Sequence, residues 1–294
     1  MPDSVLESEI RSQPDCWETA VSLAGRYRDI LPAAGERVAV IGCGTSLYIA
    51  RGYSYLRESR GLGVTDAWPA SEARLGRDYD RLVAITRSGT TSEVLAALEG
   101  FQGPRTVITA PEGTPVHKLG DTITLPEFDE QAVVQTRFAT SALALLRTHL
   151  GEDLTPVIEQ GRAVLAAPSS DLDGVRRAGQ ISFVGMGLGA ALAEEAALKL
   201  RESTQSWTES YVATEYRHGP VSIAEPGRAV WSLGPLVPGF APDVAATGAH
   251  LEHTRNDPMA ELIRVHLLCL LRAGDLGLDP GKPRNLTRSV ILDS

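Results

Sequence analysis

The chain has 294 residues, 43% of them hydrophobic and 22% charged, which is typical of a globular protein with about two domains. Its formal net charge of −9 disfavours nucleic acid and anionic membranes as partners, so an anionic ligand would need local donors. The three cysteines lie far apart in the sequence, which indicates a reducing compartment and disfavours a zinc site. They are Cys16, Cys43 and Cys269.

The N-terminus and the apolar runs predict neither export nor insertion into a membrane. Residues 1–9 are acidic and polar, so no signal peptide is expected to begin there. The longest apolar run, 265–271, is far too short to span a bilayer. We therefore expect a cytoplasmic protein.

Alternating strand and helix patterns predict a parallel α/β sheet in the first half of the chain. An apolar strand at 37–42 precedes a turn of small residues and a helix that ends near Arg60. A second strand at 80–86 leads through another turn into a helix that continues to Leu98. Helices should cover both faces of such a sheet. Two further strands are expected at 105–109 and 121–125.

The same pattern returns in the second half. A strand at 181–185 leads into a glycine-rich turn and a long helix at 191–203, and another apolar strand follows at 228–233. Gly42 and Gly185, which end corresponding strands, are 143 residues apart. This spacing indicates two copies of one α/β unit.

The remaining segments divide the chain into four parts. Residues 131–150 and 154–166 are expected to form linking helices, and 279–286 is too rich in proline and glycine for regular structure. The expected parts are an N-terminal helical segment (1–34), a first α/β domain with the linking helices (35–165), a second α/β domain (166–278) and a C-terminal tail that packs at the active site (279–294).

The turn at 85–91, with the sequence Ile-Thr-Arg-Ser-Gly-Thr-Thr, is the strongest candidate for a binding site. It lies where a strand ends and a helix begins, and free N–H groups at a helix start attract an anion. Ser88, Thr90 and Thr91 add hydroxyl donors, and the absence of a Gly-Lys-Ser/Thr ending excludes a nucleotide P-loop. A site for one phosphate is expected, although a simple capped turn is the alternative. Residues 234–237 of the second copy carry no hydroxyl groups, so only the first half should bind phosphate in this way.

The helix at 191–203 carries the candidate chemistry of the second half. Glu195, Lys199 and Glu202 share one helix face, a pattern that also fits an ordinary solvated face with salt bridges. His218 follows on a turn before Gly219-Pro220, where it could carry protons, although a loop histidine is often inert.

His250 and His253 are a weaker candidate for metal ligands. No third ligand is evident near them in the sequence, so we expect surface residues, no metal and no cofactor.

Six motifs in order along the chain resemble the double sugar-isomerase (SIS) domain family, in particular the isomerase half of glutamine–fructose-6-phosphate transaminase. They are the opening Glu9-Ile10-x-x-Gln13-Pro14, the phosphate loops Gly42-Cys43-Gly44-Thr45-Ser46 and Ser88-Gly89-x-Thr91, the signature Gln135-Thr136-Arg137, the helix and loop motifs Glu195-x-x-x-Lys199-x-x-Glu202 and Glu215-x-x-His218-Gly219-Pro220, and the tail Pro283-Arg284-Asn285-Leu286-x-Arg288-Ser289-Val290. The resemblance implies two tandem SIS domains, each a parallel sheet between helices as in flavodoxin- and Rossmann-like three-layer folds.

The resemblance also implies roles for individual residues. Glu202 would be the base that moves a proton between C1 and C2, with Glu195 and Lys199 ordering the site. His218 would assist ring opening from a partner subunit, which implies a homodimer or a higher oligomer with shared active sites. Gln135 would bind the sugar. A 6-phosphate would be bound by Thr45, Ser46, Thr86, Arg87 through its backbone, Ser88, Gly89 and Thr91.

Three departures limit what the resemblance implies. The sequence offers no amidotransferase half, so glutamine-dependent synthesis is not expected. Arg288 stands where the family has an imine-forming lysine, and a guanidinium stays protonated and forms no imine. Lys282 lies outside the motif, although a flexible tail could bring it into the site. Thr86-Arg87 replaces the family's Ser-Gln, a mild change if contacts are through backbone or hydroxyl groups.

We therefore expect an amino-sugar-phosphate isomerase or deaminase that acts on a hexosamine 6-phosphate or fructosamine 6-phosphate. An amino group already on the substrate would explain why no lysine imine is needed. The alternatives are aldose–ketose isomerisation without loss of nitrogen, and a sugar-phosphate-binding protein without catalysis.

Overall fold

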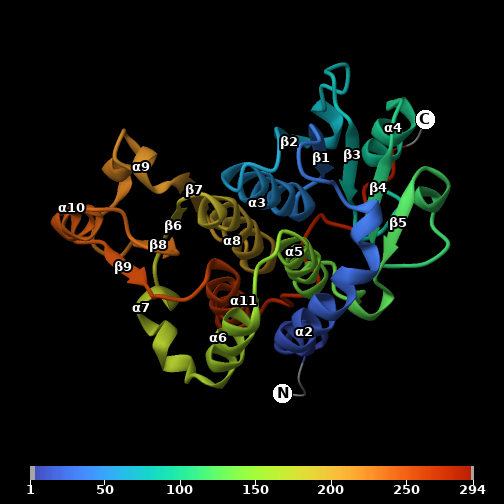
Figure 1. The fold of residues 1–294 in the computed structure, drawn as a ribbon. Helices are drawn as coiled ribbons and strands as arrows, with labels where there is room; N and C mark the ends of the chain where they lie inside the picture. Colours follow the sequence, from blue (N-terminus) through green and yellow to red (C-terminus); the bar gives the residue numbers. More distant parts are fainter. Residues whose placement is uncertain (1–3, 293–294) are drawn as a thin grey trace. The chain divides into compact units, whose positions relative to one another are not determined.

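The first sheet contains five parallel strands in the order β2-β1-β3-β4-β5 (Figure 1). Four of them lie where the sequence predicts strands, but β2 was not predicted. It is an edge strand with the sequence Thr-Asp-Ala-Trp-Pro, so it has no apolar run to reveal it. The strands are β1 (Val38–Gly42), β2 (Thr65–Pro69), β3 (Arg81–Ile85), β4 (Arg105–Thr109) and β5 (Asp121–Thr124).

Helices cover both faces of this sheet. On one face, α3 (Thr45–Ser59) packs against β1, β2 and α5 (Arg137–His149). On the other, α4 (Ser92–Gly100) buries Val94 and Leu98 against alternate strand residues such as Ile41 and Ala84. Short 3₁₀ helices lie at η1 (Ala24–Ile30), η2 (Ala70–Glu72), η3 (Pro115–Lys118) and η4 (Pro126–Phe128).

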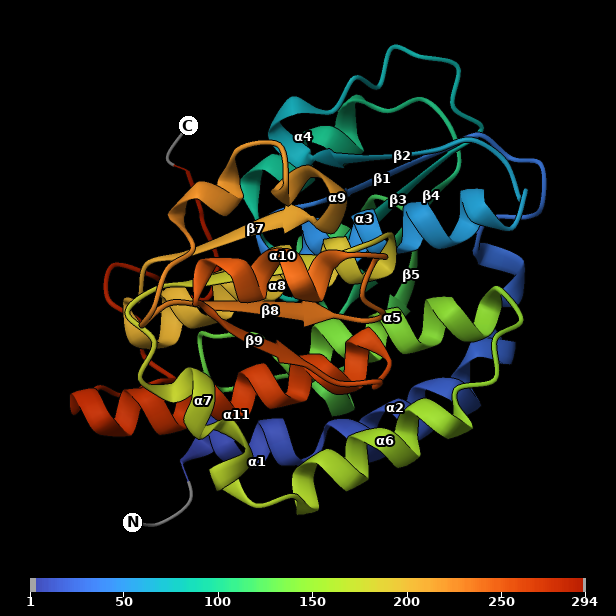
Figure 2. The ribbon, with the colours of Figure 1, turned by 90° about the vertical axis from the view of Figure 1, so that its left-hand side faces the viewer.

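The second sheet contains four parallel strands in the order β7-β6-β8-β9. Its helix α8 (Leu188–Thr204) packs on the strands and on α11 (Pro258–Leu276), which in turn contacts α6 (Thr155–Ala166). The short α9 (Ala213–Tyr216) and α10 (Phe240–Thr247) lie on the other face (Figure 2). The strands are β6 (Ile181–Gly185), β7 (Thr208–Val212), β8 (Ala229–Leu233) and β9 (His250–His253), and the remaining helices are α1 (Val5–Arg11), α2 (Gln13–Leu23), η5 (Ser169–Leu172), α7 (Asp173–Arg176) and η6 (Pro220–Ile223).

The two sheets share a strand order and a turn geometry. Strands β2-β1-β3-β4 correspond to β7-β6-β8-β9 in order and direction. Gly44 and Gly187, which precede α3 and α8, have almost the same backbone angles, with φ of 54° and 55° and ψ of −126° and −119°. The expected α/β class, with two parallel sheets flanked by helices, is therefore confirmed.

The computed structural model describes residues 4–292, which form two compact units. The first-sheet unit comprises 15–154 and 287–292, and the second-sheet unit comprises 4–14 and 155–286. Helix α6 therefore lies with the second sheet, whereas its place in the chain suggested the first, because its buried face packs on α11. Among the described residues, no helix has both the length and the apolar character needed to cross a bilayer.

A buried histidine lies in the second-sheet unit. His266 on α11 is 2% exposed, and its Nδ1 lies 3.1 Å from Nε2 of Gln13. Burial, together with the positive charge of Lys199, lowers the pKa of His266 to about 3. The folded protein therefore keeps this imidazole neutral at pH values where an exposed histidine is charged.

This burial predicts a loss of stability in mild acid. The unfolded chain protonates His266 near its ordinary pKa of 6.5, whereas the folded chain does so only near 3. Between these values the unfolded state binds more protons, so the free energy of unfolding should fall by about 1.4 kcal/mol per pH unit as the pH falls. Urea unfolding at several pH values measures the slope. His266→Gln should remove this part of it, and His250→Gln, at an exposed histidine, should not. An unchanged slope in His266→Gln would assign the pH dependence to other groups.

Candidate functional site

The candidate site of the first sheet lies at the carboxyl ends of β1 and β3. In the strand order 2-1-3-4-5 the chain leaves these neighbouring strands in opposite directions, which opens a crevice between the loops that follow them. One loop runs from Gly42 into α3, and the other is the hydroxyl-rich turn before α4. The predicted phosphate residues therefore lie where α/β sheets of this order bind ligands.

A small cavity brings most of the predicted substrate residues together. Its accessible volume is about 30 Å³. Thr45 and Gly89, which were also predicted, do not line it, but Thr45 begins α3 and Gly89 shapes the turn. The lining includes Ser46, Thr86, Arg87, Ser88, Thr91, Gln135 and Arg288.

The turn before α4 keeps hydroxyl groups available. Thr91 is the N-cap residue of α4, yet its side chain makes no capping hydrogen bond. Ser88 Oγ accepts a hydrogen bond from the backbone N–H of Thr90 at 3.2 Å, which fixes the turn. Gly89 has a φ of 65°, and a Cβ there would lie 2.2 Å from Thr114 Oγ1, so no other residue fits. Helix capping therefore does not explain why a hydroxyl group stands at position 91.

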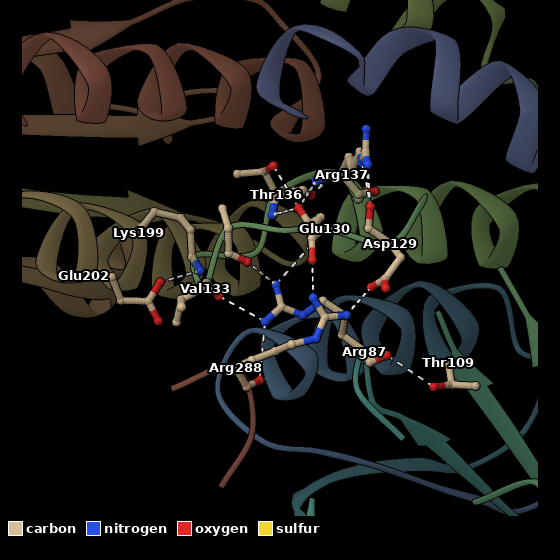
Figure 3. Close-up of polar contacts among 12 residues, drawn as sticks. Arg87, Thr109, Asp129, Glu130, Val133, Thr136, Arg137, Lys199, Glu202 and Arg288 are labelled. Carbon is tan, nitrogen blue, oxygen red and sulfur yellow. Dashed lines mark hydrogen bonds and ion pairs between the residues drawn. The ribbon is translucent and has the colours of Figure 1, made fainter. Parts of the chain in front are cut away.

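The side chain of Arg87 joins three segments beneath this turn (Figure 3). It is 2% exposed and donates to the carbonyls of Ala132 at 3.0 Å, Val133 at 3.1 Å and Arg288 at 3.3 Å. Burial lowers the pKa of Arg87, while the charge of Glu130, 3.5 Å away, opposes that shift. Only a backbone role was expected here, so the sequence did not predict this linkage.

Glu130 is a site residue that the sequence analysis missed. Its buried carboxylate accepts hydrogen bonds at Oε1 from the backbone N–H groups of Thr136 and Arg137 and from the Thr136 hydroxyl, at 2.5–2.9 Å. Its other oxygen, Oε2, lies 3.5 Å from Nη1 of Arg87. Glu130 thus caps α5 and neutralises Arg87, which explains why α5 begins at Arg137 and not at the predicted 131.

Two buried polar atoms of lining residues have no hydrogen-bond partner among residues 4–292. They are Nε of Arg87 and Oε1 of Gln135. Such groups are costly when buried, so a bound polar molecule would satisfy them. The thiol of Cys43 also lines the cavity, but burial and the charge of Glu93 raise its pKa, which leaves it a poor nucleophile.

Arg288 belongs to this site, but its guanidinium is engaged within the protein. It donates to the carboxylate of Asp129 and to the carbonyl of Glu130. Its side chain is 37% exposed, as is expected for a surface ion pair that a ligand could replace. Lys282 is 84% exposed on its side chain and lines neither of the cavities described here.

The second sheet carries the Glu195, Lys199 and Glu202 stripe on α8. Lys199 Nζ lies 2.6 Å from Glu202 Oε2 and 3.5 Å from Glu195 Oε1. The side chains of Glu195 and Lys199 are 1% exposed, and that of Glu202 is 16% exposed. The solvated-face alternative is therefore wrong for this stripe.

Glu202 lines a cavity of about 410 Å³ in the second-sheet unit, a size typical of small-molecule sites. Arg201, Arg284 and Asn285 also line it, so cationic and amide side chains share this cavity with Glu202. His218 is exposed on the turn after α9 and is not among the residues that line this cavity. The structure therefore brings Glu195, Lys199 and Glu202 together but leaves His218 apart from them.

The two predicted surface histidines form the ends of β9, the outermost strand of the second sheet. His250 Nε2 lies 3.1 Å from Glu252, and the strand was missed because its sequence, His-Leu-Glu-His, is polar. No group of three or more histidine, cysteine or acidic residues suited to a metal ion occurs within residues 4–292.

Comparison with known proteins finds relatives along nearly the whole chain, although no family model matches it. The glutamine–fructose-6-phosphate aminotransferase [isomerizing] of Aeropyrum pernix is 29% identical over 90% of this chain and 52% of the relative. That of Methanothermobacter thermautotrophicus is 27% identical over 99% of this chain and 58% of the relative. The chain thus spans just over half the length of these curated relatives.

Solved structures share the fold at lower sequence identity. Glucosamine-6-phosphate deaminase from Thermotoga maritima superimposes with a TM-score of 0.82 at 23% identity, over 98% of this chain and 100% of that one. Tagatose-6-phosphate ketose/aldose isomerase from Escherichia coli gives 0.80 at 18% identity, over 99% and 97%. The resemblance expected from the motifs is confirmed: the chain is similar in sequence to glutamine–fructose-6-phosphate aminotransferases over just over half of their length, and it shares the fold of these two solved structures.

Proposed function

We propose that this protein is an isomerase or deaminase of an amino-sugar 6-phosphate that acts by proton transfer between C1 and C2. The observation that carries the proposal is the cavity at the ends of β1 and β3, where predicted phosphate residues converge and where two lining residues each have a buried polar atom without a partner within residues 4–292. The family relationship makes a sugar phosphate the natural ligand of such a site.

The phosphate is proposed to bind to hydroxyl groups and to the start of α4. Ser46, Thr86, Ser88 and Thr91 line one cavity, and the helix dipole of α4 adds positive potential there. Both arginines of the site are paired with carboxylates, so hydrogen bonds provide most of the attraction. Gln135, with its unpartnered amide oxygen, is proposed to contact the sugar.

Glu202 is proposed as the base that moves the proton. Its carboxylate lines a cavity of ligand size, and Lys199 holds one of its oxygens at 2.6 Å. A base held in one orientation can take a proton from C2 and return it to C1. Glu195 is proposed to keep Lys199 in place, since it lies on the other side of the ammonium group, 3.5 Å away.

Loss of the amino group is proposed because the tail offers no lysine at the position of Arg288 to hold a keto sugar as an imine. Lys199 is buried and paired with Glu195 and Glu202. Arg288 cannot form one, and Lys282 is largely exposed in the tail. A substrate that already carries nitrogen needs no such lysine. The similarity in fold to a glucosamine-6-phosphate deaminase is consistent with release of ammonia.

We further propose that the two units are tandem SIS domains and that the active form is at least a dimer. The exposed position of His218, outside the Glu202 cavity of its own unit, favours a role at the site of a partner subunit.

The phosphate role of the turn predicts the effect of Thr91→Val. The change keeps the shape but removes a hydroxyl group that now makes only long contacts, of 3.4 and 3.5 Å. Calorimetry should show glucosamine 6-phosphate binding weakened by about 1.5–3 kcal/mol, through loss of a charge-assisted donor. Thr148→Val, on α5 outside the cavity, should bind normally. If Thr91→Val and Thr148→Val bind glucosamine 6-phosphate with equal affinity, the turn has only a structural role.

The base role predicts the effect of Glu202→Gln. Wild-type protein should release ammonia from glucosamine 6-phosphate and incorporate deuterium from heavy water at C1 or C2. The variant should lose about 100-fold in turnover and in deuterium exchange, with binding largely retained. Interconversion of two sugars without ammonia would support plain isomerisation. Binding without turnover by the wild type would make this a sugar-phosphate-binding protein, and normal turnover by the variant would exclude Glu202 as the base.

A shared active site predicts complementation between subunits. His218→Ala and Glu202→Gln proteins should each be nearly inactive. A mixture of dimers that exchanges subunits freely should regain about a quarter of the total wild-type activity, because about half of the dimers are mixed and each mixed dimer has one intact site of two. Native mass spectrometry would establish that mixed oligomers formed. Absence of recovery in such oligomers would place His218 and Glu202 at the same subunit's site.

A further inference from the structure

The C-terminal tail places a hydroxyl group against the turn proposed to bind phosphate. Ser289 Oγ lies 3.1 Å from Ser88 Oγ, 3.0 Å from Thr90 Oγ1 and 3.4 Å from Thr91 Oγ1. All four residues belong to the first-sheet unit, although about 200 positions separate Ser289 from the turn in sequence. No feature of the sequence assigns a role to Ser289.

The backbone of the tail also uses groups that an anion would use. The carbonyl of Val290 accepts a hydrogen bond from the N–H of Ser92, the first residue of α4, at 3.3 Å. The N–H of Leu292 donates to Ser92 Oγ at 3.0 Å, and the carbonyl of Arg288 accepts from Arg87. Backbone hydrogen bonds of Arg288, Val290 and Leu292 thus hold the tail against the turn and the start of α4.

The position of the Ser289 hydroxyl identifies what it replaces. Its oxygen lies within hydrogen-bonding distance of the hydroxyls of Ser88 and Thr90, and a phosphate oxygen would accept from the same groups. Thr90 Oγ1 also lies 3.1 Å from Ser88 Oγ, so the hydroxyls of the turn and of Ser289 form one cluster, and a phosphate oxygen placed there would compete with Ser289 for their few protons. The accessible space left beside the turn is only about 30 Å³.

We infer that Ser289 is a placeholder ligand, an internal group that occupies the phosphate site in the absence of substrate and is displaced by the phosphate group. This inference rests on the proposed phosphate role of the turn. Binding of an anion and docking of residues 289–292 are then negatively coupled, and the coupling is reciprocal. The protein's own tail competes with its substrate, and the strength of that competition sets the apparent affinity.

The inference predicts whether one substitution strengthens or weakens phosphate binding. Ser289→Ala removes the internal competitor, so inorganic phosphate and glucosamine 6-phosphate should each bind about three- to tenfold more tightly in calorimetry. Val290→Ala alters the same segment but keeps the Ser289 hydroxyl and the backbone carbonyl, so it should stay within about twofold of the wild type. Unchanged or weaker binding by Ser289→Ala would overturn the placeholder role, and weaker binding would make Ser289 a phosphate ligand.

Hydrogen exchange gives an independent measure on the wild-type protein. Saturating phosphate should speed amide exchange in peptides that cover 288–292, because Ser289 and its neighbours leave the turn. Slower exchange on phosphate binding would overturn the inference, since the anion would then be holding the tail in place. If the wild type and Ser289→Ala both fail to bind phosphate or glucosamine 6-phosphate, the proposed function falls as well. Normal phosphate binding by the wild type without the expected effects overturns only the placeholder role.

Discussion

The candidate phosphate site depends on one buried carboxylate. Glu130 caps the first turn of α5 with one oxygen and faces the guanidinium of Arg87 with the other. Arg87 in turn holds the carbonyls of residues 132 and 133 and of Arg288, so the loop before α5 and the tail are fixed through this pair. Removal of one partner from a buried ion pair typically costs about 3–5 kcal/mol, because the other charge remains without compensation. The geometry of the cavity therefore follows from Glu130, although Glu130 is not among its lining residues.

Much of the first-sheet unit follows from local sequence. The apolar runs at 37–42 and 80–86 specify buried central strands, and the glycine and hydroxyl residues after them specify the turns, so the place of the candidate site in the fold could be predicted. The edge strand β2 could not, because an edge position does not require an apolar run. The contacts of Glu130 and Ser289 could not be predicted either. Their partners lie about 40 and 200 positions away, and nothing in a local pattern marks which acidic residue or serine will meet them.

The stripe on α8 shows a different limit of sequence reasoning. Glu195, Lys199 and Glu202 have the same spacing whether they face water or lie within the protein. Tertiary packing decides between these possibilities: α8 packs on the strands of the second sheet and on α11, and the side chains of Glu195 and Lys199 are almost completely buried. Two nearly buried charges 3.5 Å apart are costly to desolvate, and a stripe meant only for stability could be replaced by apolar residues. Their position beside a cavity that contains the partly exposed Glu202 is consistent with the proposed chemical role.

The electrostatics of the phosphate site fit an acidic protein. Arg87 is paired with Glu130 and Arg288 with Asp129, so the two arginines bring little net charge to the cavity. If the site binds a phosphate as proposed, the attraction rests on hydroxyl groups and the start of α4. Hydrogen bonds of this kind act at short range and are less sensitive to salt than a field of unpaired cations. The site is thus arranged to discriminate ligands by shape and hydrogen bonding once they arrive, whereas long-range steering toward a chain of net charge −9 is weak.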